Sequence, residues 1–168
     1  MSKIDLSNIS LKDFAGYIST ESSRQKINAV LVGGACVTIY SKERYLSYDL
    51  DFATHEDIVS LEKALKCLGF TNRGKYFKHE ECKWVIEFVP TPIAVGDELL
   101  DSFVEYDTTL GKVQLLRPED CVKDRLASYF HWDDQESLTQ AVQVCLETSV
   151  DLKEIKAWAK REKKLYKV

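Results

Sequence analysis

LVGG at residues 31–34 and SYDLDF at residues 47–52 are the two stretches that decide the fold. The first is typical of a short buried strand closed by a glycine pair, and the second of a strand that carries two carboxylates. Residues i and i+2 of a strand point to the same face, so Asp49 and Asp51 project side by side. Leu50 and Phe52 then face the opposite way, into a core.

Two like charges held this close repel each other unless a cation lies between them. The usual solution is a divalent metal with oxygen ligands, typically magnesium bound to a phosphate-bearing substrate. A glycine-rich turn that opens a helix suits the phosphates, because its free backbone N–H groups point at the anion. The glycine pair at 33–34 and the two aspartates together indicate a metal–nucleotide site.

A two-metal site needs a third acidic ligand, and Glu87 is the best candidate. It is the single charge in the strand WVIEFV at residues 84–89, where an unpaired carboxylate among apolar neighbours would be costly. Glu105 is a weaker rival, because its segment is shorter and more polar. We expect Asp49, Asp51 and Glu87 to converge in one cleft, at the C-terminal end of adjacent strands.

Length and composition restrict the class of protein. The chain has 168 residues, 45% of them hydrophobic, and a net charge of −4, which fits one globular domain and argues against nucleic-acid binding by bulk electrostatics. We expect no membrane span and no secretory signal. Five scattered cysteines without a Cys-x-x-Cys pair predict reduced thiols in a cytoplasmic protein.

Hydrophobic periodicity predicts an α+β fold, a small mixed sheet with flanking helices and a C-terminal helical extension. We expect a core over residues 1–116 and the extension, packed on it, over 117–168. The predicted helices cover 10–24, 35–40, 57–68, 118–131, 134–147 and 151–164, and the predicted strands cover 29–32, 48–53, 70–73, 75–78, 83–89, 103–106 and 112–116.

The order of these motifs resembles the nucleotidyltransferase fold of the DNA polymerase β type, which has a helix-opening glycine pair or Gly-Ser, an Asp-hydrophobic-Asp strand and a later acidic strand residue. The resemblance covers roughly residues 28–146. Residues 44–52, RYLSYDLDF, are most similar to the abortive-infection toxin-like nucleotidyltransferases of bacteria, and residues 117–127 resemble the helix after the sheet in small bacterial members. Gly34 stands where serine is usual, and Glu87 where aspartate is commoner.

The resemblance implies roles for the acidic residues and the glycines. Asp49 and Asp51 would hold two Mg²⁺ (or Mn²⁺) ions, and Glu87 would complete the site of the attacking hydroxyl. Gly33 and Gly34 would let the backbone approach the β- and γ-phosphates of a nucleoside triphosphate.

Four further residues are candidates for substrate binding, each with an alternative. Ser47 could bond a phosphate or cap the entrance of the strand. Lys42 and Arg44 could neutralise the triphosphate or belong to a solvated loop. Arg125 could reach the cleft or pair with a nearby acid such as Asp124.

The predicted function is transfer of a nucleoside monophosphate from a nucleoside triphosphate to a hydroxyl. The acceptor could be an RNA end, a protein side chain or a small molecule; the C-terminal run of Lys156, Lys160, Arg161, Lys163, Lys164 and Lys167 could bind RNA phosphates or be a solvated helix end. The alternative is a non-catalytic nucleotide-binding or toxin–antitoxin partner protein that keeps the fold, with an antitoxin as a possible partner.

Overall fold

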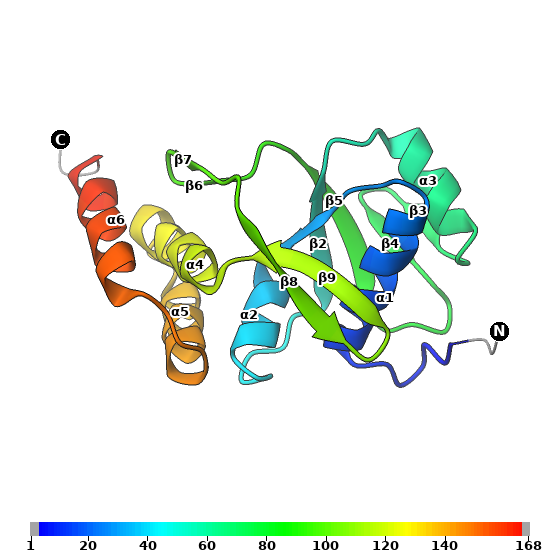
Figure 1. Ribbon diagram of the computed structural model, residues 1–168, viewed down its shortest axis with the longest axis horizontal. Coiled ribbons are helices and arrows are strands. Elements are labelled where there is room, and N and C mark those ends of the chain that lie inside the picture. The colour runs from blue at the N-terminus through cyan, green and yellow to red at the C-terminus, as the bar shows by residue number, and fades with distance from the viewer. Residues whose placement is uncertain (1–3, 166–168) are drawn as a thin grey trace.

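The structure of the chain, a computed structural model, describes residues 4–165 and consists of a sheet with helices on its faces and a helical C-terminal part (Figure 1). The helices in this range are α1 Leu11–Arg24, α2 Gly34–Tyr40, α3 Ile58–Lys66, α4 Pro118–Trp132, α5 Gln135–Glu147 and α6 Leu152–Leu165. The strands are β1 Val30–Val32, β2 Asp49–Thr54, β3 Thr71–Arg73, β4 Tyr76–Lys78, β5 Val85–Pro90, β6 Ala94–Val95, β7 Glu98–Leu99, β8 Phe103–Thr108 and β9 Gly111–Leu116.

Seven of these strands form one mixed sheet in the order β3-β4-β5-β2-β1-β9-β8. The central strand β2 runs parallel to β5 and antiparallel to β1, and β1 runs parallel to β9. In the β2–β5 pair, Asp51 lies opposite Glu87. Directly paired residues point to the same face of a sheet, so this register places the two carboxylates side by side.

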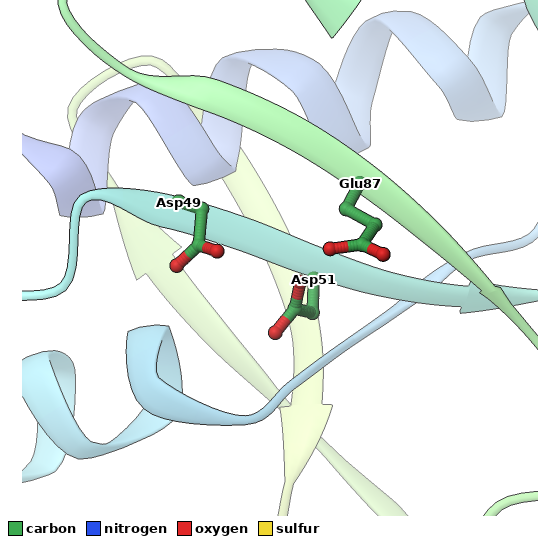
Figure 2. Close-up of side chains that lie close together, drawn as sticks. All are labelled: Asp49, Asp51 and Glu87. Carbon is green, nitrogen blue, oxygen red and sulfur yellow. The ribbon is translucent and has the colours of Figure 1, made fainter. Parts of the chain in front are cut away.

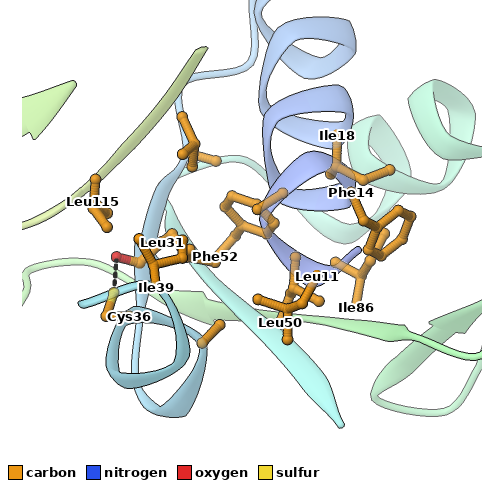
Figure 3. Close-up of a cluster of buried hydrophobic side chains, with 14 of the residues drawn as sticks. Leu11, Phe14, Ile18, Leu31, Cys36, Ile39, Leu50, Phe52, Ile86 and Leu115 are labelled. Atoms are coloured by element: carbon orange, nitrogen blue, oxygen red, sulfur yellow. Dashed lines mark hydrogen bonds between the residues drawn. The ribbon is translucent and has the colours of Figure 1, made fainter. Parts of the chain in front are cut away.

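One face of the β2–β5 pair is covered by the hydrophobic core (Figure 3). Leu50, Phe52 and Ile86 have no exposed surface and pack in the cluster to which α1 contributes Phe14. Helix α1 begins after Ser10, whose side-chain oxygen accepts a hydrogen bond from the Asp13 backbone N–H and so caps the helix. The alternation of strand side chains therefore leaves the other face of this strand pair free for polar groups.

Helices α4, α5 and α6 gather on one side of the molecule, where they meet a small hairpin formed by β6 and β7 (Figure 1). A buried lysine joins these elements. Lys123 of α4, with 2% of its side chain exposed, pairs with Glu98 of β7 at 3.1 Å and with Glu154 of α6 at 2.8 Å. Because a buried charge without a partner is costly, this network holds the hairpin to the helices.

The α+β class and the seven-stranded sheet with its helices confirm the fold predicted from the sequence, and every predicted helix and strand is present within two or three residues of its expected bounds. The β6–β7 hairpin was not predicted, because each of its strands has only two residues. The division at residue 116 stays a prediction. Lys167, of the basic run near the C-terminus, lies outside the described residues. None of the helices described is long and apolar enough to cross a membrane.

The core behind the acidic strand supplies the first test. We expect Leu50→Ala to lower the free energy of unfolding by about 2 to 5 kcal/mol, because it opens a cavity under a fully buried side chain. Urea denaturation measures the change. The control is Leu99→Ala, at a leucine that is 69% exposed, which should change stability by less than about 0.5 kcal/mol. Similar losses for both variants would contradict the packing described.

Candidate active site

Three carboxylates meet on the polar face of the β2–β5 pair (Figure 2). Asp49 and Asp51 extend from β2 and Glu87 extends from the neighbouring β5; one carboxylate oxygen of each lies within 4.8 Å of the others. The predicted convergence of these residues is confirmed. Their expected position at the C-terminal ends of the strands is wrong, since β2 begins at Asp49 and Glu87 lies in the middle of β5. All three side chains are partly exposed, Glu87 included, so they can take up ligands from solvent.

The glycine pair lies directly against the carboxylates. Gly33 has a positive φ of 68°, and a Cβ added there would lie 2.8 Å from Oδ2 of Asp51. A Cβ on Gly34 would lie 3.1 Å from Oγ of Ser47. Only glycine fits at position 33, both for its backbone conformation and for the approach of Asp51. The start of α2 is therefore packed onto the acidic cluster.

Ser47 fixes the first aspartate. Its hydroxyl donates to the carboxylate of Asp49 at 3.0 Å and to the Asp49 carbonyl at the same distance. Its backbone N–H donates to Oγ1 of Thr38 on α2, and the residue is 3% exposed. These contacts give Ser47 a place at the strand entrance. Its binding to a phosphate stays a prediction.

The surroundings of Asp51 change the pKa of its carboxyl group. Burial raises the pKa of its carboxyl group to about 6, and the negative charges of Asp49 and Glu87 contribute to this rise. The positive charges of Arg125 and Lys75 act in the opposite direction. A cation bound beside Asp51 would therefore favour its ionised form.

Arg125 lines a pocket of about 250 Å³ whose wall includes Gly33 but none of the three carboxylates. The pocket is bounded by the polar face of the sheet, by the segment that leads into β6 and by α4; Gly33, Ala53, Val89, Val95, Asp124 and Arg125 are among its lining residues. The guanidinium of Arg125 contacts Asp124 and donates to Oε1 of Gln140 at 3.3 Å. The arginine thus pairs with the adjacent acid, as one interpretation of the sequence had it, and it lines the pocket. Its reach to the acidic cluster stays a prediction.

Lys42 and Arg44 are not brought to the carboxylates. They follow the C-terminus of α2, at the opposite end of the helix from the glycine pair, and both pair with Glu147 at the end of α5. The Nε of Arg44 lies 2.6 Å from Oε1 of Glu147, and Nζ of Lys42 lies 3.6 Å from Oε2. With 70% of the Lys42 side chain exposed, these residues match the solvated-loop alternative, and a role in phosphate binding stays a prediction.

Two residues near the cluster were not found from the sequence. Lys75, in the turn between β3 and β4, has its ammonium 3.6 Å from Oε1 of Glu87. The Tyr45 ring lies close to Gly34, with its Cε1 3.4 Å from the position that a Cβ would take. No local signal places Lys75 beside Glu87, because the contact depends on the pairing of β4 with β5. Nothing in the local pattern of Tyr45 indicated its position.

Comparisons with known proteins identify solved structures that have a similar fold. No protein-family model and no curated protein matches the sequence. An antigenic nucleotidyltransferase-like protein from Paracoccidioides brasiliensis matches with a TM-score of 0.61 at 16% identity, over 83% of this chain and 76% of that one. The lincosamide antibiotic adenylyltransferase LnuA, bound to lincomycin, matches with a TM-score of 0.57 at 17% identity, over 84% and 99%.

A third solved structure agrees with these two. ANT(2")-Ia in complex with adenylyl-2"-tobramycin matches with a TM-score of 0.57 at 13% identity, over 89% of this chain and 95% of that one. At such low identities the likeness establishes the fold alone. The chain has a nucleotidyltransferase-like fold, and its three carboxylates lie on adjacent strands of that fold.

The raised pKa of Asp51 predicts how stability depends on pH in the metal-free protein. The folded state holds the Asp51 proton more tightly than the unfolded chain, in which the pKa of this carboxyl group is 3.8. Protonated Asp51 therefore adds to the free energy of unfolding. This stabilisation is fully present below pH 3.8 and is lost as pH rises through about 6. An asparagine at this position cannot titrate. The free energy of unfolding of the wild type minus that of Asp51→Asn should therefore fall over this window, as urea denaturation at several pH values would measure. Parallel pH curves for the two proteins would contradict the shift.

Proposed function

We propose that the chain is a metal-dependent nucleotidyltransferase that transfers a nucleoside monophosphate from a nucleoside triphosphate to a hydroxyl group. One observation carries the proposal: Asp49, Asp51 and Glu87 present oxygens within 4.8 Å of one another beside Gly33, in a chain with a nucleotidyltransferase-like fold. Neither part suffices alone, because exposed acidic groups are common and a fold can outlive its activity.

The donor set suits Mg²⁺ or Mn²⁺. Both ions prefer oxygen ligands, and all three residues offer carboxylate oxygens without a competing thiolate or imidazole. The pKa of Asp51 is raised first by burial and then by the negative charges of Asp49 and Glu87. A divalent ion bound between the carboxylates would offset the repulsion between these charges. The residues therefore fit the metal, and Asp49, Asp51 and Glu87 would hold it.

The chain's own residues would divide the work of the reaction. When bound, the divalent ions supply activation of the acceptor hydroxyl and neutralisation of phosphate charge. Ser47 orients Asp49 through the 3.0 Å hydrogen bond to its carboxylate. Gly33, which has no side chain, leaves the backbone at the start of α2 open to the phosphates. Arg125 faces the pocket with a permanent positive charge that can pair with a phosphate oxygen.

The acceptor is expected to enter the pocket that Gly33 lines, because position 33 lies directly against Asp51. The pocket's volume of about 250 Å³ and its mixed apolar and polar lining suit a small molecule, or the end of a larger one, whose hydroxyl points at the acidic cluster. Two structural neighbours carry antibiotics or their adenylylated product, lincomycin and adenylyl-2"-tobramycin. We therefore place a small-molecule hydroxyl first, ahead of an RNA end or a protein side chain. The free cysteines support a reducing, cytoplasmic setting.

The direct test of the reaction is labelling from a triphosphate. Wild-type protein, magnesium and a cell extract should transfer the label from an α-labelled triphosphate and not from a γ-labelled one. Asp51→Asn should reduce this transfer by at least on the order of a hundredfold, because it removes charge that balances the metals. Asp107→Asn, at an aspartate whose side chain is 83% exposed on β8, is the matched control and should transfer normally.

Three outcomes would count against the proposed reaction. Label that moves only from the γ-position would indicate a phosphoryl transfer on the same fold. Near-normal transfer by Asp51→Asn, with the fold retained, would remove the aspartate from the chemistry. No transfer by any protein, together with nucleotide binding that Asp51→Asn does not weaken, would favour the non-catalytic nucleotide-binding or toxin–antitoxin partner protein, with an antitoxin as the partner to seek.

Metal binding can be measured without knowing the acceptor. Millimolar Mg²⁺ or Mn²⁺ should raise the melting temperature of the wild type by at least about 2 °C, because the ion binds the folded state and relieves its carboxylate repulsion. The shift should be absent in Asp51→Asn and present in Asp107→Asn. Equal shifts in all three proteins would point to non-specific binding of the ion and count against the site.

A further inference from the structure

Lys75 is a cation at the edge of the acidic cluster. It is the second residue of the two-residue turn between β3 and β4, after Gly74, whose φ of 77° suits the first position of a type II′ hairpin turn. Its ammonium lies 3.6 Å from Oε1 of Glu87 and 4.8 Å from the centre of the Tyr76 ring. Lys75 is therefore held between a carboxylate and an aromatic face.

The sheet register explains why the lysine reaches this place. Tyr76 of β4 pairs with Glu87 of β5, and Glu87 pairs with Asp51 of β2. Directly paired residues share a face, so the tyrosine ring and the two carboxylates form a row across three strands. The turn that precedes Tyr76 lies at the end of this row. A lysine there is positioned by the ladder of backbone hydrogen bonds, while its side chain stays free to turn.

Among the ion pairs of the described residues, the pair that involves the cluster is the one between Lys75 and Glu87. The charge of Lys75 also acts on Asp51, together with that of Arg125. Lys75 thus contacts the cluster directly, whereas the guanidinium of Arg125 pairs with Asp124 and acts on Asp51 only through its charge. The cluster has a resident counter-ion, although it is a monovalent one.

We propose that Lys75 is an internal counter-ion that partly neutralises the cluster in the metal-free protein and moves to the polyphosphate of the substrate when metal binds. The inference rests on the proposed function, since it assigns Lys75 a part in the same site. Metal that binds through the oxygens of Glu87 displaces the ammonium by occupying its partner and by like-charge repulsion. The phosphates that arrive with the metal offer the ammonium new oxygens at the same edge of the sheet.

The contacts of Lys75 allow this exchange. The pair is long at 3.6 Å, and 65% of the lysine side chain is exposed, so little stability depends on it. The four-carbon stem of lysine can swing while the turn keeps its conformation. A buried pair such as that of Lys123 could not be released in this way, because its 2% exposed side chain has no solvent to move through.

The two halves of the inference predict opposite effects of one substitution. In Lys75→Met the cluster loses its counter-ion, so Mn²⁺ alone should bind roughly threefold to tenfold more tightly than in the wild type, as electron paramagnetic resonance titration would measure. Inorganic tripolyphosphate should bind to the Mn²⁺-saturated variant more weakly by a similar factor, as isothermal titration calorimetry would measure. Both probes are independent of the acceptor, of the base of the nucleotide and of turnover.

Two control variants separate position from charge. Lys83→Met removes a lysine that also lies over an aromatic ring, at 4.5 Å from the centre of the Trp84 ring, and that makes no ion pair with the cluster among the described residues. It should bind Mn²⁺ and tripolyphosphate as the wild type does. Lys75→Arg keeps the positive charge at the turn, so its affinities for Mn²⁺ and for tripolyphosphate should be close to those of the wild type.

The outcomes distinguish this inference from the proposed function. If the wild type binds Mn²⁺ through Asp51 but Lys75→Met binds it with equal affinity, the counter-ion role is wrong and the metal site stands. If Lys75→Met binds Mn²⁺ more tightly than the wild type but binds tripolyphosphate equally well, the proposed movement of the Lys75 side chain to the phosphates is wrong. If neither protein binds Mn²⁺, and Asp51→Asn does not differ from them, the proposed function fails and this inference fails with it.

Discussion

Repulsion among three carboxylates is the constraint on which the rest of the site depends. Asp49, Asp51 and Glu87 project from two parallel strands in register, and one oxygen of each lies within 4.8 Å of the others, so their negative charges are close together. Burial first, and the charges of Asp49 and Glu87 second, raise the pKa of Asp51 to about 6, and Lys75 forms an ion pair with Glu87. The negative charge that remains on the cluster would be neutralised by a divalent metal bound together with its phosphate substrate.

The strands can hold this arrangement because their other face is fully packed. Leu50, Phe52 and Ile86 alternate with the acidic residues and are completely buried against the helices. The energy gained by burying that face is what keeps like charges on the opposite face at a fixed separation. The glycine pair completes the arrangement, since Gly33 leaves no Cβ between the start of α2 and Asp51. Core packing and site chemistry are thus two faces of the same two strands.

The acidic cluster could be predicted from the sequence because alternation along a strand is a local signal. Asp49 and Asp51 follow from spacing alone, and Glu87 from being the one charge in an apolar strand. Residues whose position depends on pairing between distant segments could not be found in this way. Lys75 reaches Glu87 only through the β4–β5 register, and the pairing of Arg44 with Glu147 depends on how α5 packs. The sequence likewise carried no periodic signal for the two-residue strands of the β6–β7 hairpin, of which β6 lines the pocket.

The central claim is that the three carboxylates form a metal site. It is tested most directly by anomalous diffraction from crystals of the protein grown with manganese and inorganic tripolyphosphate. The account predicts an anomalous peak in contact with the carboxylate oxygens of Asp49 and Asp51, with tripolyphosphate bound on its open side. Manganese found only at other surface acids, with the cluster free of metal at saturating manganese, would contradict it.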